Sequence, residues 1–470
     1  MFLSKIIQSS FATGDRLTEV EPASSLMPPI LHATVDPQDQ LQSWEGFGAA
    51  LTEASALMLQ KLSSSDRIEL LKDLFREDHH GYTLCRIPLG SSDFSEEPWS
   101  TVNSPEAALR GEIDMSRFDA LTLPILKEIQ EISSNKLRIL VSPWSPPPFM
   151  KTNNCRLNGG KLLPEWRKPW ATQFALFLTE LVKRGFSPWA VTVQNEPEAV
   201  QKWDSCIWTA TEEAEFAVQY LRPILDAANH SHVKILLWDH NRDRLWERAQ
   251  ESMLVPGADS LDGFAFHWYG GDHFENVSRV SQKWADKLLV FSEGCIEGGS
   301  RPNAWFTGER YAHNIIGDMN HGAHAWIDWN LALNLQGGPN HVSNFCDSPI
   351  LINDTMKSVS HNSSFWTMGH FSRFIRPGAR RLPITIKTGM VPASVDGLAR
   401  DLLEGTAWMN LDKTLAVVLT NRTEAEAPWT LNFKAHSSQL TGQLPPRSIQ
   451  TLVLTLARAS HGKIEMKHKE

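Results

Sequence analysis

Eight short and almost continuously apolar segments recur along the chain, and their spacing constrains the fold more than any other feature. They are rich in β-branched and aromatic residues and cover 46–51, 82–90, 137–144, 189–197, 233–241, 263–269, 287–294 and 323–330. Strands without a polar alternation are typical of parallel sheets that are covered on both faces. The segments therefore predict eight buried parallel strands.

The segments between these strands carry helix signals. In the stretch 63–75, Ser65 or Asp66 is the expected N-cap of a helix. Thr209 and Glu212 have the spacing of a capping box. Residues 170–185 predict an amphipathic helix with a buried face made of Phe174, Phe177, Leu178, Leu181 and Val182.

This alternation of strands and helices predicts an α/β fold, with a (β/α)8 barrel over residues 42–375. A doubly wound open sheet is the alternative, and no G-x-G-x-x-G or phosphate loop follows the first strand to support it. Residues 376–458 contain shorter strand-like segments separated by turn residues, which predict a β-sandwich at the side of the barrel. We expect strands of the N-terminal segment 1–41, including ILHATV, to join this sandwich, and residues 459–470 to form a flexible tail.

Composition narrows the class of protein. The formal net charge of −9, without a basic stripe, argues against a nucleic-acid partner. The five cysteines are scattered and contain no C-x-x-C pair, so neither a zinc site nor a disulfide framework is expected. No apolar run is long enough for a transmembrane segment, and the N-terminal stretch, which has a lysine among its apolar residues, does not look like a secretory signal. A cytoplasmic location is therefore expected, and the oligomeric state is not determined by the sequence.

Two of the eight predicted strands end in a glutamate. Glu196 ends the fourth, in AVTVQNEPEA, and Glu293 ends the seventh, in LLVFSEGCIEGG. A single glutamate of this kind is most simply a turn cap or an ion-pair partner. Active sites of (β/α)8 barrels lie at the C-terminal ends of the strands, so two matched glutamates favour a functional pair. Facing carboxylates suit glycoside hydrolysis, and the amide of Asn195 is placed to bind a sugar 2-hydroxyl.

The sequence resembles glycoside hydrolase family 30, and within it the glucosylceramidase-like (acid β-glucosidase) branch. The stretches that carry the resemblance are EGFGAALTEASA, RIPLGSSDFS, ILVSPWSPPPFMKTN, AVTVQNEPEA, FAFHWYGG, VFSEGC and IDWNLALNLQGGPNHVSNFCDSPILIN. GHFSRFIRPG then leads into the predicted sandwich. The resemblance covers nearly the whole chain from about residue 40, and the last long motif is the most specific.

The resemblance implies a retaining, exo-acting β-glycosidase that needs no metal or organic cofactor. Glu196 matches the general acid/base of the family, and Glu293 matches its nucleophile. The positions that hold the terminal sugar or line the site are matched by Asp93, Trp144, Asn195, His267, Tyr269, Trp329 and Asn344. The resemblance also implies supporting roles for Arg86, beside the nucleophile, and for Asp239 and Arg242 as a pair at the end of the fifth strand. The simpler alternatives are an ion-pair role for Arg86, a core position for His267 and a filling role for the tryptophans.

The implied mechanism has two steps, in which Glu293 attacks the sugar and Glu196 acts first as acid and then as base. Retention of configuration predicts carboxyl groups about 5–5.5 Å apart. It also predicts that Glu196 titrates at a higher pH than Glu293 in the free protein.

The chain departs from the family pattern around the mouth of the site. His341, Ser343 and Cys346 replace a tryptophan, a basic residue and an aliphatic one, and the loop EAVQKWDSCIWT after Glu196 is unfamiliar. These positions affect the leaving group and not the terminal sugar, so the resemblance still implies a terminal glucose in a β-glucoside or glycolipid substrate. The leaving group stays open, and a β-1,6-glucan, an alkyl glucoside or a β-xyloside are the alternatives. A non-catalytic carbohydrate-binding barrel is the alternative from another class, and the presence of both carboxylates argues against it.

Overall fold

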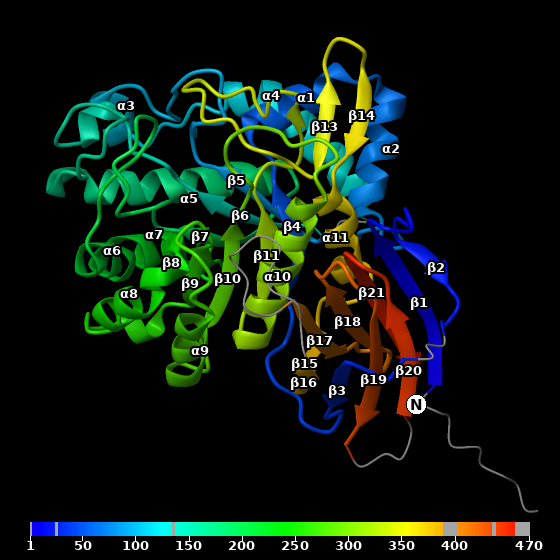
Figure 1. Ribbon diagram of the computed structural model, residues 1–470. Helices are drawn as coiled ribbons and strands as arrows, with labels where there is room; N and C mark the ends of the chain where they lie inside the picture. Colours follow the sequence, from blue (N-terminus) through cyan, green and yellow to red (C-terminus); the bar gives the residue numbers. More distant parts are fainter. Residues whose placement is uncertain (1, 24–26, 134–136, 389–401, 435–438, 456–470) are drawn as a thin grey trace, which may run out of the picture. The chain divides into compact units, whose positions relative to one another are not determined.

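The structure is a computed structural model that describes residues 2–23, 27–133, 137–388, 402–434 and 439–455 (Figure 1). The chain forms two compact units. One comprises residues 42–381, and the other combines 1–41 with 382–470. The first unit thus extends six residues beyond the predicted boundary at 375, and the predicted flexible tail 459–470 lies outside the described residues.

The larger unit is a closed barrel of eight parallel strands, which confirms the predicted (β/α)8 architecture. Its strands are β4 (Gly46–Ala50), β5 (Leu84–Pro88), β6 (Arg138–Ser142), β7 (Ser187–Thr192), β8 (Lys234–Asn241), β9 (Gly263–His267), β10 (Leu288–Glu293) and β11 (Ala325–Asp328). They follow one another around the barrel in sequence order, and β11 closes it by pairing with β4. The barrel interior is filled by an apolar layer that includes Leu84, Leu140, Leu236 and Val290.

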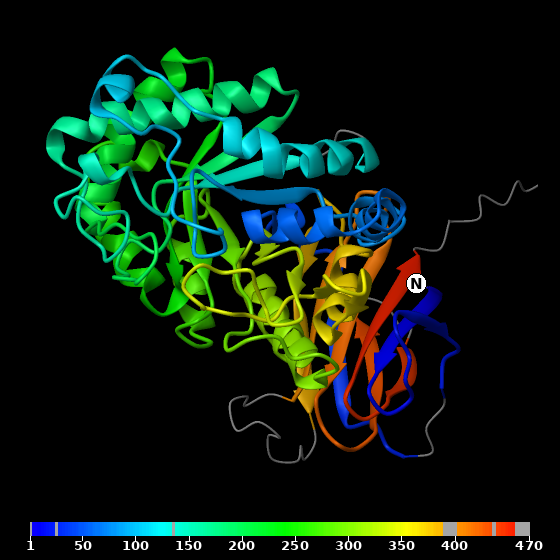
Figure 2. The ribbon, with the colours of Figure 1, turned by 90° about the horizontal axis from the view of Figure 1, so that it is seen from above.

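Helices surround this barrel on its outside (Figure 2). They are α1 (Glu53–Lys61), α2 (Ser64–Phe75), α3 (Pro105–Leu109), α4 (Ser116–Ile132), α5 (Arg167–Lys183), α6 (Ala210–Phe216), α7 (Arg222–Ala227), α8 (Leu245–Ser252), α9 (Phe274–Lys283), α10 (Trp305–His321) and α11 (Ser363–Ser372). Short helical turns lie at η1 (Pro148–Met150), η2 (Pro164–Trp166), η3 (Ala217–Leu221), η4 (Arg242–Arg244) and η5 (Ala258–Ser260). A small sheet of β12 (Leu333–Asn334), β13 (Ile350–Asn353) and β14 (Ser358–His361) follows β11.

Two helix details differ from the sequence expectation, and one agrees with it. The N-cap of α2 is Ser63, whose hydroxyl accepts the Asp66 N–H at 3.1 Å, and not Ser65 or Asp66. Val182 in α5 is 48% exposed, because it lies at the edge of the apolar face and not within it. The capping box of Thr209 and Glu212 at the start of α6 is confirmed.

The smaller unit is a sandwich of two sheets, as predicted. One sheet contains β17 (Leu403–Met409), β18 (Leu415–Asn421), β21 (Ser448–Thr455), β1 (Phe2–Ser10) and β2 (Thr18–Val20) in that order. The other has the order β16 (Ile384–Thr388), β3 (Leu31–Val35), β19 (Ala427–Phe433) and β20 (Gln439–Leu444). The short strand β15 (Arg380–Leu382) is the sixth strand of the first sheet, next to β17.

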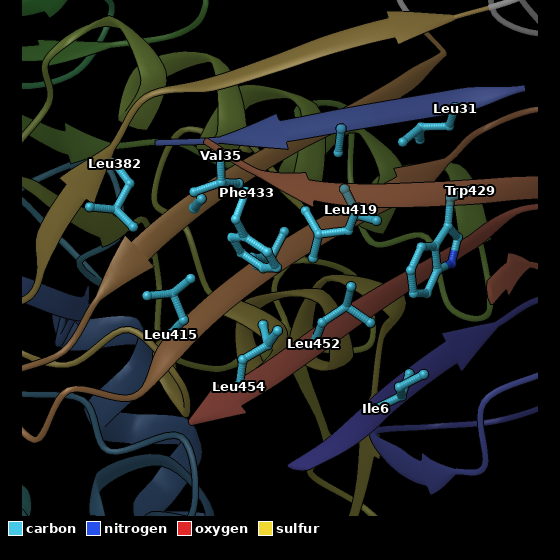
Figure 3. Close-up of a cluster of buried hydrophobic side chains, with 14 of the residues drawn as sticks. Ile6, Leu31, Val35, Leu382, Leu415, Leu419, Trp429, Phe433, Leu452 and Leu454 are labelled. Carbon is cyan, nitrogen blue, oxygen red and sulfur yellow. The ribbon is translucent and has the colours of Figure 1, made fainter. Parts of the chain in front are cut away.

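The N-terminal segment belongs to the sandwich. β3 pairs with β16 in antiparallel and with β19 in parallel orientation, which confirms the expected role of ILHATV. The apolar stretch at the N-terminus forms β1, and Ile6 lies opposite Leu452 of β21. Side chains from both sheets meet in one apolar core, shown in Figure 3. No helix within the described residues has the length and apolar character needed to cross a membrane.

Candidate active site

The two glutamates lie in different local structures, one at the end of a strand and the other in a turn that follows a strand. Glu293 is the last residue of β10. Glu196 lies four residues beyond the end of β7 in a turn, so the predicted strand 189–197 is shorter than expected. Its backbone has a φ of +48°, which is uncommon for a residue other than glycine, and its N–H donates to the carbonyl of Asp239 at 3.0 Å. The turn after β7 is thereby tied to the end of β8.

The end of β8 is irregular, and this irregularity supplies two residues to the site. The pairing of β8 with β9 shifts register between Trp238 and His240, and both Trp238 and Asp239 have positive φ values. In a regular strand, consecutive side chains point to opposite faces. Here Asp239 and His240 both face the site, since Asp239 contacts Arg86 while His240 approaches Glu196.

Arg86 on β5 is the buried cation of the site, with no exposed surface. Its guanidinium donates to Glu293 Oε2 at 2.6 Å, to Asp239 Oδ2 at 2.7 Å and to Asn195 Oδ1 at 2.9 Å. It also lies 4.8 Å from the centre of the Trp144 ring. Arg86 therefore pairs with two buried carboxylates at once, which combines the predicted role beside Glu293 with the ion-pair alternative.

His267 at the end of β9 brings the two glutamates together. Its Nε2 lies 3.1 Å from Asp239 Oδ1, and its Nδ1 lies 3.4 Å from Glu196 Oε1 and 4.0 Å from Glu293 Oε1. Two carboxylates from distant parts of the chain thus face the same imidazole nitrogen. The hydroxyl of Tyr269 donates to Glu293 Oε1 at 3.1 Å, the same oxygen that faces His267.

The charged groups in this cluster shift one another's pKa values. Burial opposes the protonation of His267, but the carboxylates of Glu293, Asp239 and Glu196 around it raise its pKa to about 9. Burial raises the pKa of Glu293, although His267 and Arg86 oppose this. Burial favours the neutral form of Glu196 as well, yet His240 and His267 hold its pKa below the usual value. The free protein therefore favours the opposite order to the one expected from the sequence, because the two histidines lie beside Glu196.

Six of the seven side chains that were predicted to hold the sugar or line the site form part of the wall of one cavity of about 160 Å³, and the exception is His267, which lies behind the two glutamates. The predicted residues in its wall are Asp93, Trp144, Asn195, Glu196, Tyr269, Glu293, Trp329 and Asn344. The rings of Trp144 and Trp329 are stacked, with centroids 5.2 Å apart. Asp93 accepts the amides of Asn344 and Asn340 at 3.0 and 3.1 Å, and burial raises the pKa of Asp93 to about 7.

Arg242 is placed differently from the prediction. Its guanidinium donates to both carboxylate oxygens of Asp318 on α10, each at 2.8 Å, and it stacks 4.3 Å from the ring centre of Phe274. It makes no pair with Asp239, which is bound to Arg86 instead. Arg242 thus links η4 at the end of β8 to α10, outside the cavity wall.

A larger cavity, about 390 Å³, lies elsewhere in the barrel unit and is lined by Tyr82, Thr83 and Arg376 among others. It borders the residues that precede β5, at the N-terminal end of the strands. In (β/α)8 barrels the functional residues lie at the opposite end, so this cavity is not the candidate site.

Comparison with known proteins identifies the family. Residues 44–375 match the glycosyl hydrolase family 30 TIM-barrel domain, and residues 378–452 match the β-sandwich domain of the same family. The chain belongs to glycoside hydrolase family 30. It is therefore a glycosidase, which acts on a glycoside substrate.

Relatives of this family 30 glycosidase match it over most of their length. The mouse "Lysosomal acid glucosylceramidase" is 31% identical over 419 residues, which is 85% of this chain and 79% of that protein. The crystal structure of SrfJ from Salmonella typhimurium has a TM-score of 0.88 at 33% identity, and the match covers 96% of this chain and 99% of that one. The endo-β1,6-glucanase BT3312 has a TM-score of 0.83 at 26% identity with the same coverage.

The cavity of this family 30 enzyme also contains residues that sequence reasoning missed. They are His240, Asn241, Cys295 and Glu297, and the wall also contains Gln201 and Trp203 from the unfamiliar loop after Glu196 and Cys346, which was noted as a departure from the family pattern. His240 directly follows Asp239, and a regular strand would turn the two to opposite faces. Only the irregularity at the end of β8 brings both inward. Glu196, His240 and His267 form the single group of three potential metal ligands found within the described part of the chain.

Proposed function

We propose that this chain is a retaining, exo-acting β-glucosidase with Glu293 as nucleophile and Glu196 as general acid/base. The observation that carries the proposal is the convergence of both carboxylates on Nδ1 of His267, beside the cavity of about 160 Å³. Ligand pockets for drug-sized molecules usually have 300–1,000 Å³, so this cavity suits a single sugar ring. A pocket of one ring favours release of a terminal sugar.

The first step is attack by Glu293 on the anomeric carbon while Glu196 gives its proton to the leaving oxygen. Arg86 and Tyr269 each hydrogen-bond one oxygen of Glu293, so they orient the carboxylate and favour its ionised form. In the second step a water molecule attacks the glycosyl-enzyme, and Glu196 accepts its proton. The distance of about 5–5.5 Å between the carboxyl groups stays a prediction of this mechanism.

Glu196 must carry a proton when the substrate is bound. In the free protein its carboxylate is stabilised by His240 and His267, which hold its pKa down. A bound sugar excludes water from the cavity, and removal of water disfavours the charged form of a carboxyl group. We therefore expect substrate binding to raise the pKa of Glu196 into the range required of a general acid.

The wall of the cavity fits the recognition of a sugar. Asp93 and Asn195 offer polar groups, and Trp144 and Trp329 offer ring surfaces. Both amides that bond Asp93 reach Oδ2, and we assign Oδ1 to a sugar hydroxyl. Asn195 is held by Arg86, which leaves its amide N–H₂ for the 2-hydroxyl.

The first candidate for the leaving group is ceramide, since the mouse relative is named a glucosylceramidase. A second candidate is another glucose unit, as in a β-1,6-glucan, because Gln201, Asn241 and Glu297 make part of the cavity wall polar. The likeness to BT3312, named an endo-β1,6-glucanase, supports the β-1,6 linkage, whereas the one-ring pocket favours cleavage at the end of such a chain and not within it.

Turnover of an aryl β-glucoside by the full chain tests the proposal. We expect Glu293→Gln to lower kcat by about 10³-fold or more. Glu198→Gln is the matched control, because Glu198 lies two residues from Glu196 but pairs with Arg244. Near-normal turnover by Glu293→Gln would contradict the role of nucleophile.

Proton NMR of the sugar released first tests retention. A β-anomer is expected, and an α-anomer would exclude the double displacement. Rates on aryl β-glucoside, β-xyloside, β-galactoside and β-fucoside decide the sugar. Rates on glucosylceramide in detergent and on a β-1,6-linked diglucoside decide the leaving group.

A further inference from the structure

The surroundings of Glu196 match a metal site better than they match a hydrogen-bond network. Its Oε1 lies 3.4 Å from Nδ1 of His267 and 3.6 Å from Nδ1 of His240. Good N–H···O hydrogen bonds measure 2.7–3.2 Å, so both distances are too long for strong bonds. Ligand atoms placed 2.0–2.1 Å from a tetrahedral Zn²⁺ ion lie about 3.3–3.4 Å from one another. The two spacings therefore agree with the edges of a zinc coordination sphere.

His240 supplies an unused donor atom. Its Nδ1 is buried, and no hydrogen-bond partner is found for it within the described structure. The ring is held by packing, with its centroid 5.0 Å from that of Trp238. A buried and unpaired ring nitrogen that faces a carboxylate is unfavourable unless a ligand satisfies it.

His267 is oriented as zinc-binding histidines commonly are. Its Nε2 lies 3.1 Å from Asp239 Oδ1, and this leaves Nδ1 to face Glu196. In metal sites the second ring nitrogen of a histidine ligand usually donates to a carboxylate, which fixes the ring and raises its affinity. Asp239 is itself fixed by Arg86 at 2.7 Å, so the orientation of His267 is well determined.

The donor set decides the class of ion. One nitrogen from each of two histidines and one carboxylate oxygen suit late first-row divalent ions such as Zn²⁺, whereas Mg²⁺ prefers oxygen ligands only. The three ligand atoms lie within 4.8 Å of one another, so one ion can contact all three after a small shift of the His240 ring, while His267 stays fixed by Asp239. Glu196 and His240 also line the cavity, which gives a fourth ligand access.

We propose that Glu196, His240 and His267 bind one Zn²⁺ ion, and that this ion inhibits glycoside hydrolysis by occupying the carboxylate of the general acid. Binding of the ion releases the Nδ1 proton of His267 to solvent, because an imidazole must be neutral to be a metal ligand. An ion on Oε1 of Glu196 takes the place of the proton that the leaving oxygen needs. The ion is an inhibitor and not a cofactor. The inhibitory part rests on the acid role proposed for Glu196, whereas the binding itself does not.

Calorimetric titration of the full chain with Zn²⁺ tests the binding. One ion per chain is expected, with no comparable binding of Mg²⁺. His240→Phe keeps the packing on Trp238 but removes the donor, so the dissociation constant should rise about 100-fold. His273→Gln is the matched control, because His273 Nδ1 lies 3.4 Å from Glu275 Oε1, the same spacing as His267 to Glu196, on an exposed surface. Unchanged affinity in His240→Phe, or an equal loss in His273→Gln, would overturn the site.

A second variant guards against a folding defect. Glu196→Gln keeps the shape of the side chain and removes the anionic ligand, so it should also weaken Zn²⁺ binding by at least tenfold, while thermal unfolding confirms that it folds. Inhibition is then measured on aryl β-glucoside turnover, with recovery expected after addition of EDTA. Zn²⁺ that binds without slowing turnover would overturn the inhibitory role. A protein that turns over no β-glycoside refutes the proposed function, and the titration still decides the metal site.

Discussion

The sandwich core and the active end of the barrel are both buried, but they bury opposite kinds of side chain. The sandwich core consists of apolar residues such as Leu31, Leu419 and Leu452 (Figure 3). The active end of the barrel instead buries Arg86 and Asp239, both without exposed surface. A buried aliphatic side chain stabilises a fold by about 1.5–3 kcal/mol, whereas a buried ion pair contributes little net stability and is costly to break. The sandwich is thus organised for stability and the end of the barrel for chemistry.

The largest effect should follow removal of the cation that the barrel buries. Arg86→Met leaves the carboxylates of Glu293 and Asp239 without their shared partner. We expect a loss of about 3–5 kcal/mol in the free energy of unfolding and at least about 10³-fold in kcat/KM. Urea unfolding and aryl β-glucoside turnover measure the two effects. A variant with normal activity would show that the buried charge is structural alone.

A cavity in the sandwich core should affect stability without affecting chemistry. Leu452→Ala removes a fully buried side chain from β21, and we expect the free energy of unfolding of the sandwich to fall by about 2–5 kcal/mol. At 25 °C, where the variant is still folded, kcat should stay within twofold of the parent. A large fall in kcat at that temperature would end the distinction between the two regions.

Burial of the ionised carboxylate of Asp93, a residue of the site, should lower the free energy of unfolding. Burial raises its folded-state pKa to about 7, above the value near 3.9 of an unfolded chain. The unfolded state loses the Asp93 proton first, so stability falls as the pH rises from about 4 to 7. Asp93→Asn removes this loss, and the variant should be more stable than the parent by about 2–4 kcal/mol at pH 8 and by little at pH 4.

Urea unfolding of Asp93→Asn at the two pH values measures this difference, with the exposed Asp226→Asn as control. The same variant should lose activity, because the carboxylate proposed to hold a sugar hydroxyl is gone. Equal stabilisation at both pH values would exclude a role of the raised pKa.

The smallest effect is expected at the surface of α5. Val182→Lys places a charge at a side chain that is 48% exposed, so the free energy of unfolding should change by less than about 0.5 kcal/mol. Phe177→Lys, at a fully buried position of the same helix, is the matched contrast and should prevent folding. Strong destabilisation by Val182→Lys would restore the original interpretation of the apolar face.

Local patterns predicted what depends on local structure. The eight apolar segments became the eight barrel strands, and the spacing of Thr209 and Glu212 became a capping box. The choice of Ser63 as the cap of α2 was not predictable, since three consecutive serines offer equivalent hydroxyls. The exposure of Val182 was missed because helical periodicity locates the centre of the apolar face but does not define how wide the buried part of that face is.

The apolar and turn patterns along the chain were sufficient to predict a (β/α)8 barrel with a sandwich and to place glutamates near the ends of two strands. Tertiary structure decided which groups meet: Arg86 bonds Asp239 and Glu293, while Arg242 turns away to Asp318. It also decided that His240 faces Glu196, through the irregular end of β8. The physical reason is that strand and helix periodicity act between neighbours in the chain, whereas the partner of a buried charge is set by the closure of the barrel.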